Sequence, residues 1–213
     1  ATPTRTRTPV GTPTQSPTPS PTPVCFSAMR NGGFEKDEGW EMPETAYPAA
    51  YSSALAHSGA RSVRLGIVEG SPVLSYSSAR QALYIPSSAT SVRIAFWCYP
   101  ISEDTAHGRQ YALLLDADKQ YLETVMWIAS NAATWSAREY EITGHAGKTL
   151  WLQFGVYNDG QGGATAMYVD DVAVRVCGPE GFITATPTAG ASATPSATRT
   201  PERSATPTPS PSL

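Results

Sequence analysis

Two adjacent aspartates, Asp170 and Asp171, interrupt a stretch that is otherwise rich in apolar residues, YVDDVAV. A carboxylate inside a buried strand is costly unless a cation or hydrogen-bond donors offset its lost hydration. The pair therefore has two interpretations. Either it contributes to a cation site, or Asp170 faces water and Asp171 caps a turn.

Local motifs that usually mark a catalytic centre do not occur in the sequence. There is no GxSxG, no HExxH and no phosphate-binding glycine loop. The three histidines, His57, His107 and His145, all fall in predicted turns, where an imidazole is usually just solvated. We therefore expect no enzyme activity, although the two carboxylates of a glycosidase could lie far apart in a sequence.

The three cysteines occupy informative positions. Cys25 opens and Cys177 closes the apolar part of the chain, so we predict a disulfide between its first and last strands. The alternative is a pair of free thiols. Cys98 alternates with Ile94 and Phe96 and is predicted to be a small buried apolar residue. No spacing of cysteine and histidine suggests zinc.

Threonine and proline are concentrated at the two ends of the chain. Residues 1–23 and 183–213 contain almost no large apolar side chain, so both are predicted to be disordered, extended linkers that are candidates for O-glycosylation. Residues 24–182 remain as one folded domain. Because the chain starts inside such a linker, we expect a piece of a longer multidomain protein that is secreted or displayed at the cell surface, with neighbouring domains covalently attached.

The charge of the folded segment argues against two classes of partner. Four of the 15 basic and one of the 18 acidic residues lie in the tails, which leaves 11 basic and 17 acidic residues and a net charge of −6. Nucleic-acid binders concentrate Lys and Arg on one face, and anionic membranes attract basic segments. No apolar run approaches the ~18 residues of a membrane span. We expect a monomer that neither binds nucleic acid nor inserts into a membrane.

Short apolar runs separated by turn-forming clusters predict an all-β domain. Leu150, Leu152, Phe154 and Val156 alternate with polar or small residues, so each such strand has one face in a core. Two sheets must then pack face to face. The predicted strands are Ser62–Ile67, Tyr76–Ile85, Val92–Tyr99, Tyr111–Asp116, Leu122–Ile128, Trp135–Ile142, Thr149–Tyr157 and Ala166–Val176.

A series of landmarks appears in a recognisable order along residues 30–176. They are Asn31–Glu35 (NGGFE), Gly39-Trp40, His57–Gly59, Gln81–Pro86, Phe96-Trp97, Trp135, Asn158–Gly160 and Tyr168–Val172. This order and spacing resemble the carbohydrate-binding modules of the galactose-binding-like jelly-roll type, which are appended to secreted xylanases and cellulases. The resemblance implies a two-sheet jelly-roll β-sandwich.

A structural calcium ion is also implied by the resemblance. Its ligands would be the side chains of Glu35 and Asp171 and the backbone carbonyls of Gly33 and Ala60. Hard carboxylate and carbonyl oxygens suit Ca²⁺. The sequence departs from some members of the family at His57, where they offer a further carboxylate.

The same resemblance places a sugar cleft on the outer face of one sheet. Alternation along its strands then nominates outward residues: aromatic rings to stack on the apolar face of a sugar, and Arg or Gln side chains to bond its hydroxyls. The candidates are Tyr76, Arg80, Trp127, Trp151, Gln153 and Tyr157. The alternative for each is a residue that only covers the sheet, because Tyr and Trp are common in strands.

Two functions from different classes follow from these observations. The first is a non-catalytic carbohydrate-binding module that binds a polysaccharide or another glycan and keeps its parent protein near it. The second is a structural or adhesive spacer that kept the fold and lost the cleft. The two differ in whether the nominated side chains converge in one open groove.

Overall fold

The computed structural model describes residues 22–104 and 106–181, and within them every regular element is a strand. The predicted Thr/Pro linkers lie outside the described residues, apart from Thr22 and Pro23. The strands are β1 (Val24–Ser27), β2 (Ala50–Ser52), β3 (Ser62–Gly66), β4 (Leu74–Tyr84), β5 (Ser91–Ser102), β6 (Arg109–Leu115), β7 (Tyr121–Ile128), β8 (Ser136–Ile142), β9 (Thr149–Asp159) and β10 (Thr165–Gly178).

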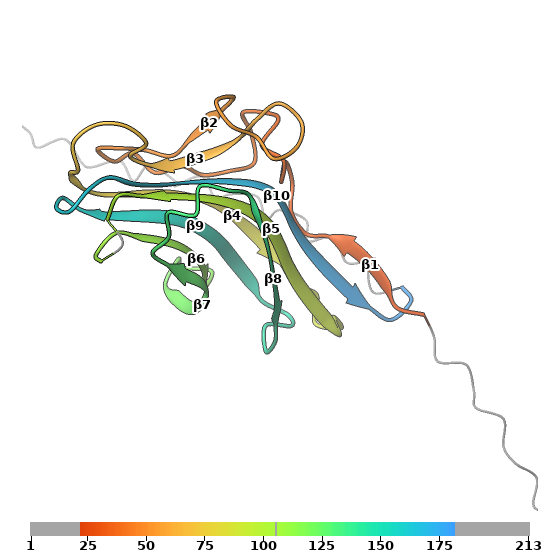
Figure 1. Ribbon diagram of the computed structural model, residues 1–213. Coiled ribbons are helices and arrows are strands. Elements are labelled where there is room, and N and C mark those ends of the chain that lie inside the picture. Colours follow the sequence, from red (N-terminus) through yellow and green to blue (C-terminus); the bar gives the residue numbers. More distant parts are fainter. Residues whose placement is uncertain (1–21, 105, 182–213) are drawn as a thin grey trace, which may run out of the picture.

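The strands form two antiparallel sheets. One has the order β2-β3-β10-β5-β8, with β1 paired to β10, and the other has the order β4-β9-β6-β7. Figure 1 shows the sheets as two layers, with β1 beside the far part of β10 at one end of the molecule. The fold is therefore an all-β sandwich, as predicted. None of the described residues forms a helix that is long and apolar enough to cross a membrane.

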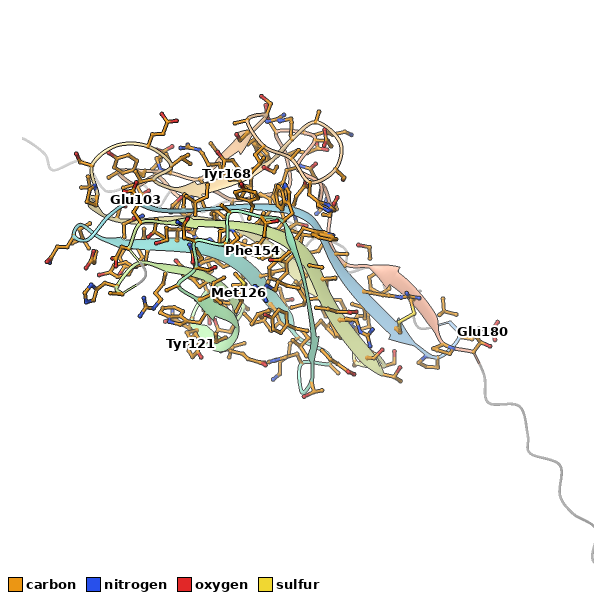
Figure 2. All side chains as sticks on the ribbon, viewed as in Figure 1. Glu103, Tyr121, Met126, Phe154, Tyr168 and Glu180 are labelled. Atoms are coloured by element: carbon orange, nitrogen blue, oxygen red, sulfur yellow. A yellow bond between two sulfur atoms is a disulfide. The ribbon has the colours of Figure 1, made fainter. Side chains whose placement is uncertain are left out.

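The core lies between the two layers and follows the period of two. Ile94 and Phe96 from one sheet and Leu152 and Phe154 from the other are almost completely buried. Phe96 and Phe154 meet across the sandwich in an edge-to-face contact with ring centroids 4.8 Å apart. Figure 2 shows Phe154 between the layers and Tyr121 on the outside. Alternation along each strand thus leaves one face of the β4-β9-β6-β7 sheet available for a ligand.

All eight predicted strands are present, with ends that differ from the predicted ones by at most three residues. β1 and β2 were not predicted, because strands of four and three residues show too little alternation to be recognised. β1 pairs with the end of β10, and Cys25 is directly opposite Cys177 in this register.

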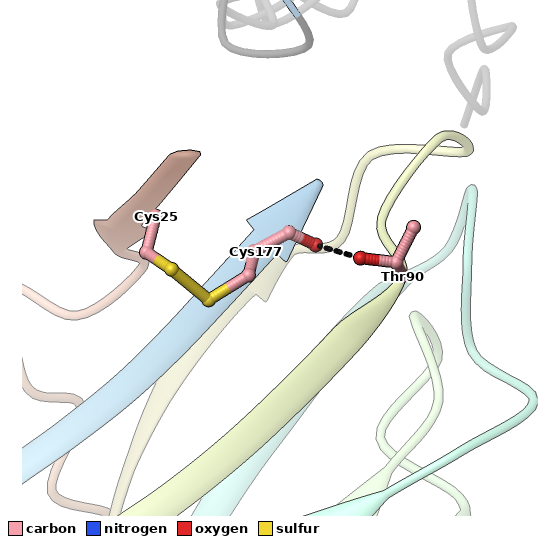
Figure 3. The surroundings of a disulfide bond; sticks show 3 residues. All are labelled: Cys25, Thr90 and Cys177. Atoms are coloured by element: carbon pink, nitrogen blue, oxygen red, sulfur yellow. Dashed lines mark hydrogen bonds between the residues drawn. A yellow bond between two sulfur atoms is a disulfide. The ribbon is translucent and has the colours of Figure 1, made fainter. Parts of the chain in front are cut away.

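The predicted disulfide between Cys25 and Cys177 is confirmed. It joins β1 to β10 across a sequence separation of 152 residues. Figure 3 shows it beside Thr90, whose hydroxyl donates to the Cys177 carbonyl over 3.2 Å. Cys98 is a free thiol and is fully buried, as expected. The bridge ties together the two chain ends of the described domain.

Candidate functional site

The outer face of the β4-β9-β6-β7 sheet carries side chains in four rows that run across the strands. Every second residue of β4, β9 and β6 points to this face, whereas two register shifts in the β6–β7 pair space the matching residues of β7 three apart. Strand register decides which residues share a row. Because a strand rises about 3.4 Å per residue, the first and fourth rows are about 20 Å apart. The rows are Tyr76, Tyr157 and Arg109; Ser78, Gly155, Tyr111 and Trp127; Arg80, Gln153, Leu113 and Thr124; and Ala82, Trp151, Leu115 and Tyr121.

Residues of the first two rows, together with Leu113 of the third and residues of the adjoining turns, line an open groove of about 640 Å³. Its lining is mainly aromatic and apolar, with polar groups at one side. The residues are Tyr76, Ala106, His107, Arg109, Tyr111, Leu113, Trp127, Tyr157 and Asp159. Tyr76 and Trp127 remain 58% and 55% exposed, so large rings face solvent here. This combination of exposed rings and a few polar groups is the usual composition of a small-ligand site.

The four rings of the groove are arranged in two pairs. Tyr76 and Tyr157 have centroids 4.9 Å apart, and Tyr111 and Trp127 are stacked at 5.7 Å. Tyr111 lies flat at the bottom and is only 6% exposed. Burial raises the pKa of its hydroxyl to about 12, against the opposite effect of a hydrogen bond with Gln153. The phenol is therefore neutral at physiological pH.

Tyr111 lies flat because the residue beneath it is glycine. A Cβ added at Gly155 would be 2.2 Å from Cζ and 2.4 Å from Oη of Tyr111. Any other residue at position 155 would therefore force the Tyr111 ring to shift from this position. The φ angle of Gly155 is not positive, so close approach and not backbone freedom requires the glycine.

The polar side of the groove is built around Asp104, which is buried. Its carboxylate accepts hydrogen bonds from the N–H groups of Ala106, His107 and Gly108 over 2.9–3.0 Å. The bond from His107 is the main reason that the pKa of Asp104 is below its usual value. Arg109 donates to the carbonyls of Ala106 and Gly108. This turn holds the His107 and Arg109 side chains at the edge of the groove.

At the opposite end of the sheet, charged residues surround Trp151. Lys119 Nζ is 4.4 Å from the ring centroid, and Arg80 Cζ is 5.9 Å from it. Both cations bind Glu41: Lys119 Nζ reaches its two carboxylate oxygens at 3.0 and 2.8 Å, and the Arg80 guanidinium pairs with Oε1. Hydrogen bonds from Arg80 and then Lys119 lower the pKa of Glu41. Trp151 is thus covered by a network of Lys119, Glu41 and Arg80.

The six residues predicted to bind sugar all lie on this outer face, but they do not form one cluster. Tyr76, Trp127 and Tyr157 line the groove. Gln153 lies one row further along, next to Tyr111. Arg80 and Trp151 belong to the charged network at the other end.

The sequence-based selection missed Tyr111, Arg109, His107 and Asp159. Tyr111 could have been found by alternation, because Ala112 and Leu114 point into the core. The positions of the other three residues at the groove depend on how turns from different strands come together, and the periodicity of the sequence does not predict this.

A second polar centre lies where the residue 57–61 turn meets β10. The Asp170 carboxylate accepts the N–H groups of His57 and Ser58 at 2.8 and 3.1 Å, and Asp171 binds His57 Nδ1 and the Ser58 hydroxyl, both at 2.6 Å. Glu35 Oε1 accepts the Ala60 N–H at 2.9 Å.

The idea that Asp170 faces water is wrong. Its side chain is fully buried, and burial is the main reason that its pKa is raised. β10 contains a register shift between Asp170 and Ala173, and Asp171 has a φ of +49°. This bulge lets two consecutive aspartates contact the same turn.

The residues at this centre fit a calcium ion in their donor chemistry. A Cβ added to Gly33 would be 4.0 Å from Asp171 Oδ1 and 3.9 Å from Glu35 Cγ, so three of the predicted ligands are neighbours. Ala60 also lies beside Glu35, but its N–H, and not the carbonyl predicted as a ligand, contacts the carboxylate. Within the described part of the chain, His57 is the only basic side chain that contacts these carboxylates. The excess of negative charge favours a cation.

Among the described residues, a different trio brings three potential metal-ligand atoms together. One ligand atom each of Asp104, His107 and Asp159 lies within 4.8 Å of the others. The Asp104 oxygens already accept three backbone N–H groups, which explains this carboxylate without a metal.

Comparison with known proteins shows a similarity of fold to solved structures. No family model matches the chain, and no curated protein matches it. Among solved structures it is similar to carbohydrate-binding modules. TmCBM61, solved in complex with beta-1,4-galactotriose, is 18% identical over 70% of this chain and 97% of that chain, with a TM-score of 0.49. The C-terminal family 22 carbohydrate-binding module of Clostridium thermocellum Xyn10B is 12% identical over 74% and 94%, with a TM-score of 0.44.

A viral enzyme contains a similar domain. The enzymatically active domain of Bacteriophage CBA120 tailspike protein 4 is 12% identical over 70% of this chain, with a TM-score of 0.48. This chain spans only 21% of that protein's chain.

Proposed function

We propose that this protein is a carbohydrate-binding module whose ligand is a neutral glycan held in the groove over Tyr111. The observation that carries the proposal is the groove itself, in which two exposed rings, Tyr76 and Trp127, surround a buried aromatic floor. A sugar ring has apolar C–H faces that pack on aromatic faces, while its hydroxyls need donors and acceptors at the edge.

The charges of the groove favour a neutral ligand. The basic side chains of Arg109 and His107 are balanced by the carboxylate of Asp159, whose Oδ2 is 3.6 Å from His107 Nδ1. Arg109 also shares its Nη1 between two carbonyls, so its charge is partly compensated. Hydroxyl groups can bond to donors and acceptors of this kind without the strong field that a uronate or sulfate requires.

Binding is tested by a glycan array followed by titration calorimetry with the full-length chain. Tyr157→Ala removes one ring of the Tyr76–Tyr157 pair, so we expect affinity to fall at least about tenfold, which corresponds to ~1.4 kcal/mol. The matched control is Tyr121→Ala. Tyr121 is 62% exposed on the same sheet but lies outside the groove, so its removal is expected to leave affinity unchanged.

Two outcomes would count against the proposal. Equal losses in Tyr157→Ala and Tyr121→Ala would mean that the groove is not the site. If the folded protein bound no glycan on a broad array, this result would favour the structural or adhesive spacer instead.

The wider role that we propose is proximity and not catalysis. A module of this kind, tethered through Thr/Pro-rich linkers to neighbouring domains of a secreted or cell-surface protein, would raise the local concentration of the parent protein at a polysaccharide. The disulfide supports an extracellular setting, because such bonds persist in oxidising compartments.

We also propose that calcium binds at the second polar centre in a structural role. Glu35 and Asp171 would hold it through their side chains, and Gly33 and Ala60 through their carbonyls. The ion would neutralise carboxylates that otherwise repel one another, and so connect the residue 33–35 segment to β10.

Calcium is expected to raise the melting temperature by about 5–10 °C when present at ~100 times its dissociation constant. The measurement is a thermal melt in Ca²⁺ and in EDTA. Glu35→Gln should abolish the difference, whereas Glu38→Gln, which alters a nearby exposed carboxylate, should keep it. Identical melting curves of the unaltered protein in Ca²⁺ and EDTA would contradict the site.

A further inference from the structure

We propose that the network of Lys119, Glu41 and Arg80 closes the groove at its Trp151 end, so that the module recognises short glycans or chain ends. This inference rests on the proposed sugar binding and adds a limit on ligand length. It concerns Trp151, which has the right type and orientation for a stacking residue yet lies outside the groove.

The Trp151 ring already has a partner on its face. The Lys119 ammonium lies 4.4 Å from the ring centroid, within the range of a favourable cation–π contact. The Arg80 guanidinium is 5.9 Å from the same centroid. A sugar that stacked on this ring would have to displace Lys119.

Lys119 is held over the ring from two sides. Its ammonium donates to both carboxylate oxygens of Glu41, and Glu41 is itself fixed by backbone hydrogen bonds with Arg80 in both directions, at 2.8 and 2.9 Å. At the other end of the side chain, the Lys119 backbone sits in a turn with a φ of +63° that Asp116 caps by accepting the Gln120 N–H. Charge-assisted bonds of this kind are stronger than neutral ones.

The position of the network sets the usable length of the site. From the Tyr157 row to the Gln153 row the sheet spans about 14 Å, and the Trp151 row would extend this to about 20 Å. With Lys119 in place, sugar units beyond the Gln153 row meet charged side chains instead of an aromatic face. The network is therefore a determinant of specificity for chain length.

The experiment measures affinity against ligand length with the full-length chain. The probes are the xylo-, cello- and β-1,4-galacto-oligosaccharide series, each from disaccharide to hexasaccharide. We expect the affinity of the unaltered protein to level off by the trisaccharide. Lys119→Gly removes the side chain, and glycine adopts the positive φ without strain. In this variant we expect the hexasaccharide to bind at least ten times more tightly than the trisaccharide.

Two further variants separate the network from general effects. Glu41→Gln keeps the backbone bonds to Arg80 but weakens the hold on Lys119, so it should show a smaller gain in the same direction. Trp151→Ala combined with Lys119→Gly should remove the gain. Lys36→Ala, which alters an exposed lysine away from the sheet face, is the control and should match the unaltered protein.

The possible failures are distinguishable. If the unaltered protein binds and its affinity already climbs tenfold from trisaccharide to hexasaccharide, the groove is open at Trp151 and the inference is wrong while sugar binding stands. If Lys119→Gly shows no gain for the hexasaccharide, the network does not limit length. If neither protein binds any series, the proposed function fails and the inference fails with it.

Discussion

Replacing both Cys25 and Cys177 by serine is expected to lower the free energy of unfolding by about 2–5 kcal/mol, the largest stability effect of any change considered. The bridge joins two cysteines that are 152 residues apart in the sequence. In the chain-entropy model, closing so long a loop strongly restricts the unfolded chain. In the folded state it also secures β1, which pairs only with β10 among the described strands. The measurement is equilibrium unfolding in urea.

Cys98→Ala is the control for this prediction. It also removes a thiol, but it leaves the bridge intact and deletes a buried sulfur, with an expected cost of about 1 kcal/mol. A double serine variant that unfolds at the same urea concentration as the unaltered protein would show that the bridge contributes nothing to stability.

The second large effect is expected on binding. Gly155→Ala places a methyl group 2.2 Å from Tyr111 Cζ and 2.4 Å from its Oη, so the ring must shift from its position on the groove floor. We expect a loss of glycan affinity of at least about tenfold, with an overpacking cost of about 1–3 kcal/mol in stability. Calorimetry for affinity and urea unfolding for stability separate the two.

Gly144→Ala provides the matched comparison. Gly144 has a φ of +78°, so alanine there is strained, yet no heavy atom lies within 4 Å of the added Cβ. This variant should lose stability and keep its affinity. If Gly155→Ala also kept full affinity, Tyr111 would not be part of the binding floor.

The strands of the core could be predicted because their alternation is a local property. Residues 92–98 and 150–156 repeat apolar side chains at every second position, and both segments are strands whose apolar residues are buried. β2 has three residues and, among the described strands, pairs only with β3, so nothing local distinguishes it from a loop. The disulfide was predictable because its cysteines mark the two ends of the apolar segment.

The site was predictable only in part. Alternation turned Tyr76 and Tyr157 outward, since the parity of β4 and β9 follows from their core residues, and both line the groove. It does not give the orientation of Trp127, because the adjacent residues Val125 and Met126 of β7 are both buried. The pairing of Lys119 and Arg80 with Glu41 was not predictable, because Glu41 lies 78 residues from Lys119 and 39 from Arg80 in the sequence. Which aromatic ring is open and which is covered therefore required the three-dimensional structure.

The most direct test of sugar binding is an NMR titration that follows the indole N–H signals of the five tryptophans as an oligosaccharide is added. We predict that the Trp127 signal shifts with ligand concentration, because its ring lines the groove, while the buried Trp40 does not respond. Saturation of the Trp127 shift would support a glycan in the groove. An unchanged Trp127 signal at saturating ligand would contradict it.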